Sequence, residues 1–189
     1  MNGAAHRSSD SPRLGGDGAA EAPSRPTLAL VWRVGRLLCA SEAATIEEVL
    51  SPVPCWAAPL VPPWVRGLFS YRGELAAMVD VAALLGIEAT EDRMSNRVLV
   101  MRLDPHGSTT GAAERGARLL GLWVHSVLDL ASVDFRSAAA HPGFANDQAR
   151  FLGPIGQTPW GLAQLVTPRE LFTEEQWAVV SARLREGGA

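Results

Sequence analysis

The feature that most constrains this chain is a series of short apolar runs, each ended by glycine, proline or a polar cluster. The sequence holds 18 glycines and 13 prolines, which fall mostly between these runs. Short runs with turn residues between them are typical of β-strands. The sequence therefore predicts a mainly β protein built as small barrels rather than as βαβ units. The predicted strands are residues 27–34, 36–40, 45–50, 68–71, 75–79, 97–103, 117–124, 126–133, 151–155 and 160–166. For residues 45–50 the alternative is a helical turn, whose spacing Ile46, Val49 and Leu50 also fit.

The two ends of the chain differ from this strand-rich middle. Residues 1–26 are rich in Gly, Ala, Ser and Pro and hold one large aliphatic side chain. Such a segment cannot bury enough surface to offset the entropy of ordering it, so we expect a disordered tail. We expect one folded domain over residues 27–172 and a C-terminal helix over residues 173–189.

Two capping patterns precede that helix. Thr167 and Glu170 have the spacing of a capping box, and Thr173 and Gln176 repeat it. The apolar face of the helix, which we expect to pack on the domain, is formed by Trp177, Val180 and Leu184.

The segment between residues 63 and 86 is the densest in local signals. Pro63 can open one helical turn over residues 63–68. The dipeptide Arg72-Gly73 then predicts a hairpin turn, because it separates two apolar runs. Asp80 is placed to cap a short helix at residues 81–85 that stops at Gly86.

Composition excludes several classes of function. The net charge of −3 gives no basic surface for nucleic acid. No lysine is present, which removes Schiff-base catalysis and a phosphate-loop lysine. The lone pair of cysteines, Cys39 and Cys55, suits buried thiols in a reducing cytoplasm. No run of 18 apolar residues occurs, so we expect no direct membrane insertion.

Catalytic and metal motifs are missing as well. The four histidines lack the spacing of metal ligands, and no nucleophile elbow or glycine-rich phosphate loop occurs. We therefore expect no cofactor and no enzyme. The alternative is a small-molecule-binding or enzymatic barrel that uses Arg72, Glu74 and Asp80. Two roles stay open for Arg72 itself: it reads a partner's carboxylate, or it pairs within its own fold.

One segment resembles a known family. Residues 63–75 (PWVRGLFSYRGEL) resemble the Pro-x-Val-x-Gly-Leu-x-Asn-x-Arg-Gly segment of the CheW family of chemosensory coupling proteins. Further matches are Val79-Asp80, Leu84-Leu85-Gly86, residues 46–50, residues 98–101 and residues 120–124, and the resemblance spans about residues 27–172. The sequence GLFSYRG (residues 67–73) resembles the corresponding segment of the Wsp-type couplers of surface-sensing systems. Ser70, His125 and Ser126 depart from the family pattern, which has Asn at the first position and often acidic residues at the other two.

This resemblance implies a fold of two SH3-like five-stranded β-barrels packed on a shared core, with short helices and a C-terminal helix. It implies a non-enzymatic, cytoplasmic adaptor that couples the cytoplasmic tip of chemoreceptors to the regulatory domain of a CheA-type histidine kinase. The receptor would bind in a groove between the lobes. The interface residues that the resemblance implies are Ile46, Glu48, Val49, Arg72 and Gly73.

Overall fold

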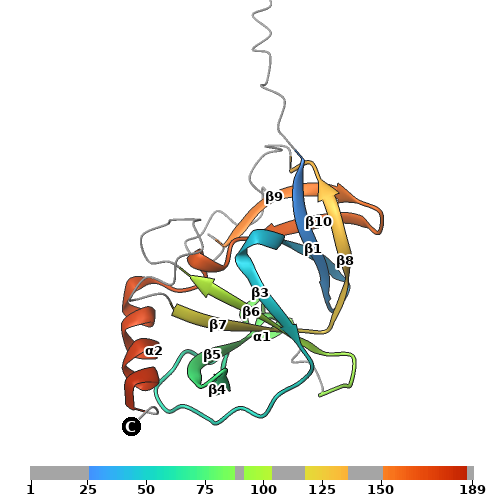
Figure 1. The fold of residues 1–189 in the computed structure, drawn as a ribbon. Helices are drawn as coiled ribbons and strands as arrows, with labels where there is room; N and C mark the ends of the chain where they lie inside the picture. The colour runs from blue at the N-terminus through green and yellow to red at the C-terminus, as the bar shows by residue number, and fades with distance from the viewer. Residues whose placement is uncertain (1–25, 88–91, 104–117, 136–150, 187–189) are drawn as a thin grey trace, which may run out of the picture.

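The computed structural model describes residues 26–87, 92–103, 118–135 and 151–186 as a two-lobed, mainly β protein (Figure 1). Lobe A consists of β1 Thr27–Val34, β2 Leu37–Glu42, β8 Ser126–Val133, β9 Leu152–Thr158 and β10 Gly161–Val166. Lobe B consists of β3 Ile46–Leu50, β4 Val65–Tyr71, β5 Glu74–Asp80, β6 Arg97–Leu103 and β7 Arg118–Val124. The short helical elements are η1 Ala43–Thr45, α1 Val81–Leu84 and η3 Pro168–Glu170, and the C-terminal helix is α2 Glu174–Glu186.

The two lobes share one pattern of strand pairing. Lobe A has the order β8-β1-β2-β10-β9 and lobe B the order β3-β6-β7-β5-β4. In both, the third and fourth strands are parallel and the other neighbours are antiparallel. Lobe A takes strands from both ends of the chain, so the chain enters lobe B through η1 and returns between β7 and β8. These observations confirm the predicted fold of two five-stranded lobes.

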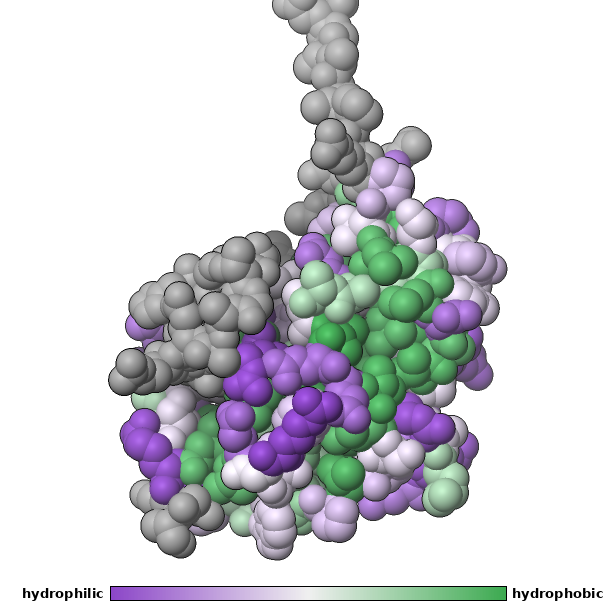
Figure 2. All heavy atoms as spheres, viewed as in Figure 1, coloured by the Kyte–Doolittle hydropathy of each residue, from purple (hydrophilic) through white to green (hydrophobic). Residues whose placement is uncertain are grey.

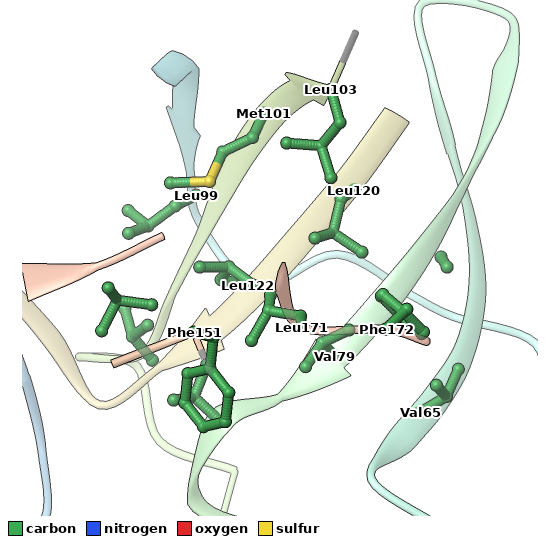
Figure 3. Close-up of a cluster of buried hydrophobic side chains, with 14 of the residues drawn as sticks. Val65, Val79, Leu99, Met101, Leu103, Leu120, Leu122, Phe151, Leu171 and Phe172 are labelled. Atoms are coloured by element: carbon green, nitrogen blue, oxygen red, sulfur yellow. The ribbon is translucent and has the colours of Figure 1, made fainter. Parts of the chain in front are cut away.

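A shared core lies between the lobes. The evidence is that several strands are buried on both faces, one toward the shared core and one toward the interior of their own lobe. On β6, Leu99, Met101 and Leu103 belong to the shared core, whereas Val98 and Val100 belong to the interior of lobe B. Figure 3 shows leucines of β6 and β7 pointing toward Phe151 and Leu171, which come from the C-terminal third of the chain. Burial on both faces explains why these runs are continuously apolar rather than alternating.

Helix α2 covers part of this core. Trp177 is 6% exposed and Val180 fully buried, and both belong to the shared core. The rings of Trp64 and Phe172 lie with centroids 4.6 Å apart, and those of Phe172 and Trp177 4.3 Å apart. In Figure 1 the helix stands beside lobe B. The spacing of apolar residues thus identified the buried face of α2 correctly.

An isolated β-bridge, which the sequence did not predict, closes lobe B. Trp56 exchanges two backbone hydrogen bonds with Leu68 of β4, with N···O distances of 2.7 and 2.8 Å. The adjacent Gly67 has φ +150°, and a Cβ atom there would lie 2.1 Å from the carbonyl oxygen of Trp56. Only glycine lets the two backbones approach this closely.

Of the two local predictions for residues 63–86, the helix cap at Asp80 is confirmed and the helical turn at residues 63–68 is largely wrong. Asp80 caps α1, since its Oδ1 accepts hydrogen bonds from the backbone N–H groups of Ala82 (3.0 Å) and Ala83 (3.2 Å). The helical turn predicted at residues 63–68 is wrong beyond its first two residues, because Val65 already begins β4. Pairing with β5 and with Trp56 outweighs the local preference of Pro63 for a helix start.

The two capping boxes also had different outcomes. Thr173 and Gln176 cap α2 reciprocally, with hydrogen bonds of 2.9 and 3.2 Å. The side chain of Thr167 makes no capping hydrogen bond, because residues 168–170 form only a single 3₁₀ turn. Residues 1–25 of the tail predicted at residues 1–26 lie outside the described residues, as do the last three residues of the predicted C-terminal helix.

Candidate functional site

The β4–β5 hairpin ends in a tight two-residue turn. Arg72 has φ +51° and Gly73 has φ +84°. Positive φ at both central residues defines the type I′ turn, whose twist matches that of paired strands. Glycine adopts this conformation freely, but at Arg72 it is strained. The structure therefore presents the Arg72 side chain from a rigid hairpin tip.

Arg72 and Tyr71 both bind one carboxylate on the opposite edge of lobe B. The Nη2 atom of Arg72 donates to Oε2 of Glu48 at 2.8 Å, and the hydroxyl of Tyr71 donates to the same oxygen at 2.8 Å. The Arg72 guanidinium also lies over the Tyr71 ring, 5.0 Å from its centroid. Because β3 and β4 are the two edge strands of lobe B, these contacts join its edges.

A second ion-pair network lies on the same lobe. The Nε atom of Arg102 donates to Glu47 at 2.5 Å, and its Nη1 donates to Glu74 at 3.3 Å. Arg102 thus links β3, β6 and β5. We call the six side chains of these two networks the charged rim: Glu47, Glu48, Tyr71, Arg72, Glu74 and Arg102.

Electrostatics fix the protonation of the rim. The pKa of Tyr71 lies above its ordinary value of 10, through burial first and the hydrogen bond to the Glu48 carboxylate second. The pKa of Arg102 is raised, chiefly by its hydrogen bond to Glu47. At neutral pH Tyr71 is therefore a neutral hydrogen-bond donor and Arg102 a cation.

An apolar surface lies where the two lobes meet. Leu28 on β1 is 54% exposed and Leu130 on β8 is 49% exposed, and the β1–β8 register places Leu130 opposite Leu30. On β3, Ile46 packs on the shared core and Val49 is 39% exposed. We call the exposed Leu28, Val49 and Leu130, together with the partly buried Ile46, the interlobe apolar face. Figure 2 shows apolar surface over β1 and β8 beside a hydrophilic band at β3.

The structure brings the sequence-predicted site residues to one region of lobe B. Glu48 and Arg72 form an ion pair, Gly73 completes the turn, and Ile46 and Val49 lie on the other face of β3. Sequence reasoning missed Tyr71, Glu47 and Arg102, whose partners are 23 to 55 residues away. It also missed Leu28 and Leu130. Leu130 lies opposite Leu30, which is two residues from Leu28 on β1, so only the strand register brings these leucines together.

Of the three residues of the catalytic alternative, Asp80 lies apart from Arg72 and Glu74. Arg72 pairs with Glu48 and Glu74 pairs with Arg102. Asp80 is at the far end of β5, about 20 Å from Glu74 at strand spacing, where it caps α1 and lies 3.5 Å from Arg66. Among the described residues, no three His, Cys, Asp or Glu side chains are grouped to hold a metal ion. Burial raises the pKa of Cys39 to about 12, so its thiol is unreactive at neutral pH.

One negative finding concerns membranes. Within the described ranges, every helix is too short or too polar to cross a bilayer.

Comparisons with known proteins point to one family. The CheW-like domain family model matches residues 28–176. The chemotaxis protein CheW of Rhizobium meliloti (strain 1021) is 26% identical over 121 residues, which cover 64% of this chain and 70% of that protein. The crystal structure of the scaffolding protein TtCheW from Thermoanaerobacter tengcongensis superposes with a TM-score of 0.64 at 20% identity, over 80% of this chain and 90% of that one. The chain therefore belongs to the CheW-like domain family.

Proposed function

We propose that this protein is a non-enzymatic adaptor that couples the cytoplasmic tip of chemoreceptors to the regulatory domain of a CheA-type histidine kinase. The observation that carries the proposal is the interlobe apolar face beside the charged rim. Family membership supports it, because the relatives found carry the names of a chemotaxis protein and a scaffolding protein. An adaptor of this kind works in the cytoplasm, next to the receptor's membrane.

The interlobe apolar face has the character of a docking surface for an amphipathic helix. Leu28 and Leu130 project from neighbouring strands and Val49 from β3, so apolar contacts are available on both lobes. The rim residue Glu48 is only partly covered, with 39% of its side chain exposed, and Arg72 is 71% exposed. A helix with one apolar stripe and polar flanks matches this combination. We propose that Arg72 both joins the edges of lobe B and contacts the receptor.

A second surface is available to the kinase. Leu37 (48% exposed), Trp160 (40%) and Leu162 (66%) lie on lobe A at the starts of β2 and β10. The parallel β2–β10 register pairs Gln164 with Cys39, and extending it by two residues aligns Leu162 with Leu37. Aromatic side chains are enriched at protein interfaces, and exposed apolar patches mark interaction sites. Two separate surfaces allow both partners to bind at once.

Within the family we propose the Wsp-type branch, in which the signalling output is a diguanylate cyclase. The sequence GLFSYRG supports this, and Tyr71 within it makes a hydrogen bond to Glu48. Reconstitution with Wsp-type and with flagellar-type receptor tips checks the branch. Preference for a flagellar-type tip would contradict it.

The experiment for the main proposal is a binding assay with two purified partners. We expect the full chain to bind a CheA-type regulatory domain and a receptor-tip hairpin with dissociation constants near the micromolar range, because single interfaces in multivalent arrays are modest. We expect a ternary complex when all three are mixed. Absence of binding to either partner at tens of micromolar would overturn the proposal.

A further inference from the structure

His125 is the single residue that connects the two lobes on the return of the chain. Strand β7 of lobe B ends at Val124, and β8 of lobe A begins at Ser126. The backbone N–H of His125 donates to the carbonyl oxygen of Arg33 on β1, at 2.9 Å. The crossover is therefore held against lobe A by its main chain, and it has no spare length with which to adjust.

The imidazole makes a second contact to the same strand pair. The backbone N–H of Gly35, in the β1–β2 turn, donates to Nδ1 of His125 at 2.7 Å. Gly35 has φ +56°, so its amide direction is fixed by a turn conformation that favours glycine. A Cβ atom on Gly35 would contact Ile87, which packs on the shared core just after α1. The histidine thus joins the crossover to the β1–β2 turn of lobe A.

The contact requires the neutral ring, since Nδ1 accepts only when it carries no proton. The pKa of His125 lies below its ordinary value of 6.5, first because the partly buried ring loses hydration when charged. Among the described residues, two charged groups act on the imidazole. The Asp80 carboxylate at the end of β5 favours the protonated ring, and the Arg93 guanidinium ahead of β6 opposes it.

We propose that His125 is an acid-sensitive latch between the two lobes: protonation of Nδ1 breaks the hydrogen bond from Gly35 and loosens the junction between β7–β8 and the β1–β2 turn. The neutral ring contributes stability that is fully present above the ordinary pKa. That contribution is lost as the pH falls below 6.5 and through the lower pKa of the folded state. Mild acidification would therefore weaken the lobe junction without unfolding either lobe.

The test is an NMR titration of the full, ¹⁵N-labelled chain from pH 7.5 to pH 5. We expect the Nδ1 resonance of His125 to report an unprotonated acceptor at pH 7.5. The amide resonance of Gly35 should shift with the same midpoint as the imidazole, and its protection factor, which corrects for the slower intrinsic exchange at lower pH, should fall over the same range. A Gly35 amide that stays protected throughout the titration of His125 would overturn the proposal.

A variant supplies a second, independent measurement. His125→Asn places a carbonyl oxygen near the position of Nδ1, so it keeps an acceptor that does not titrate. We expect its urea midpoint to fall less than that of the wild type between pH 7.5 and pH 5. His6→Gln, which alters a histidine far from the junction in sequence, is the matched control and should retain the wild-type pH dependence. An identical pH dependence in His125→Asn and wild type would contradict the latch.

Discussion

The two lobes share the same strand-pairing pattern yet differ in what fills them and in what their hairpins present. The interior of lobe B contains Phe69, Tyr71, Met78 and Trp123, whereas that of lobe A is mainly small residues such as Ala29 and Ala131. The β4–β5 hairpin of lobe B ends in Arg72-Gly73 with charged neighbours. Its counterpart in lobe A, the β9–β10 hairpin, ends in Pro159-Trp160 and is followed by the exposed Leu162.

The pairing of the strands and the chemistry of the hairpin tips are therefore specified by different residues. Parallel and antiparallel neighbours recur in the same order although the two sets of strands have little sequence in common. Burial of apolar side chains is enough to hold the same strand pairing in both lobes, although these side chains are large in lobe B and small in lobe A. The tips of the β4–β5 and β9–β10 hairpins can differ in their side chains because they lie outside the cores. We therefore expect substitutions in the cores to affect stability and substitutions at the tips to affect binding.

The largest effect is expected from emptying the interior of lobe B. Phe69 and Val31 are both fully buried, in lobe B and lobe A respectively. We expect Phe69→Ala to lower the free energy of unfolding by about 4 kcal/mol and Val31→Ala by about 2 kcal/mol, because the aromatic ring leaves the larger cavity. Chemical denaturation measures both. Equal losses would show that the two interiors contribute alike.

A slightly smaller effect is expected from the glycines that permit close approach. A Cβ atom at Gly67 would meet the Trp56 carbonyl at 2.1 Å, whereas one at Gly156 of lobe A would meet a Val133 methyl at 2.3 Å and the Phe135 ring at 2.8 Å. Backbone cannot move aside as side chains can. We therefore expect Gly67→Ala to cost about 3 kcal/mol and Gly156→Ala about 1.5 kcal/mol in thermal or urea unfolding. The reverse order would contradict the closure of lobe B by Trp56.

The smallest stability effect is expected at the hairpin tip of lobe B. Arg72→Ala should cost less than about 1 kcal/mol, because exposed ion pairs contribute little. The matched variant Tyr71→Phe removes only the second hydrogen bond to Glu48. We expect Arg72→Ala to weaken receptor-tip binding at least tenfold and Tyr71→Phe to weaken it less. A loss of several kcal/mol in Arg72→Ala would show that the arginine acts mainly in folding.

The sequence predicted most of the fold because local signals and pairing agree over most of the chain. Strands at residues 27–34, 97–103 and 126–133 begin and end where apolar runs meet turn residues. The failure at residues 63–68 has a physical cause. Local preference favoured a turn, but pairing with β5 and with Trp56 is non-local and cannot be read from spacing.

The candidate site was predictable only in part for the same reason. Arg72-Gly73 is a local turn signal, and Glu48 came from the family resemblance. The contacts of Tyr71 with Glu48 and of Arg102 with Glu47 join strands that are distant in sequence. The exposure of Leu28 and Leu130 depends on how the two lobes are arranged in space, which cannot be read from the local sequence.

The most direct test of the adaptor function compares two exposed leucines on lobe A. Leu130 belongs to the interlobe apolar face, and Leu162 lies at the start of β10 on the second apolar surface. Calorimetric titration with a receptor-tip hairpin should show that Leu130→Glu abolishes binding while Leu162→Glu retains the wild-type dissociation constant. Unchanged binding in Leu130→Glu, or equal loss in both variants, would contradict receptor docking between the lobes.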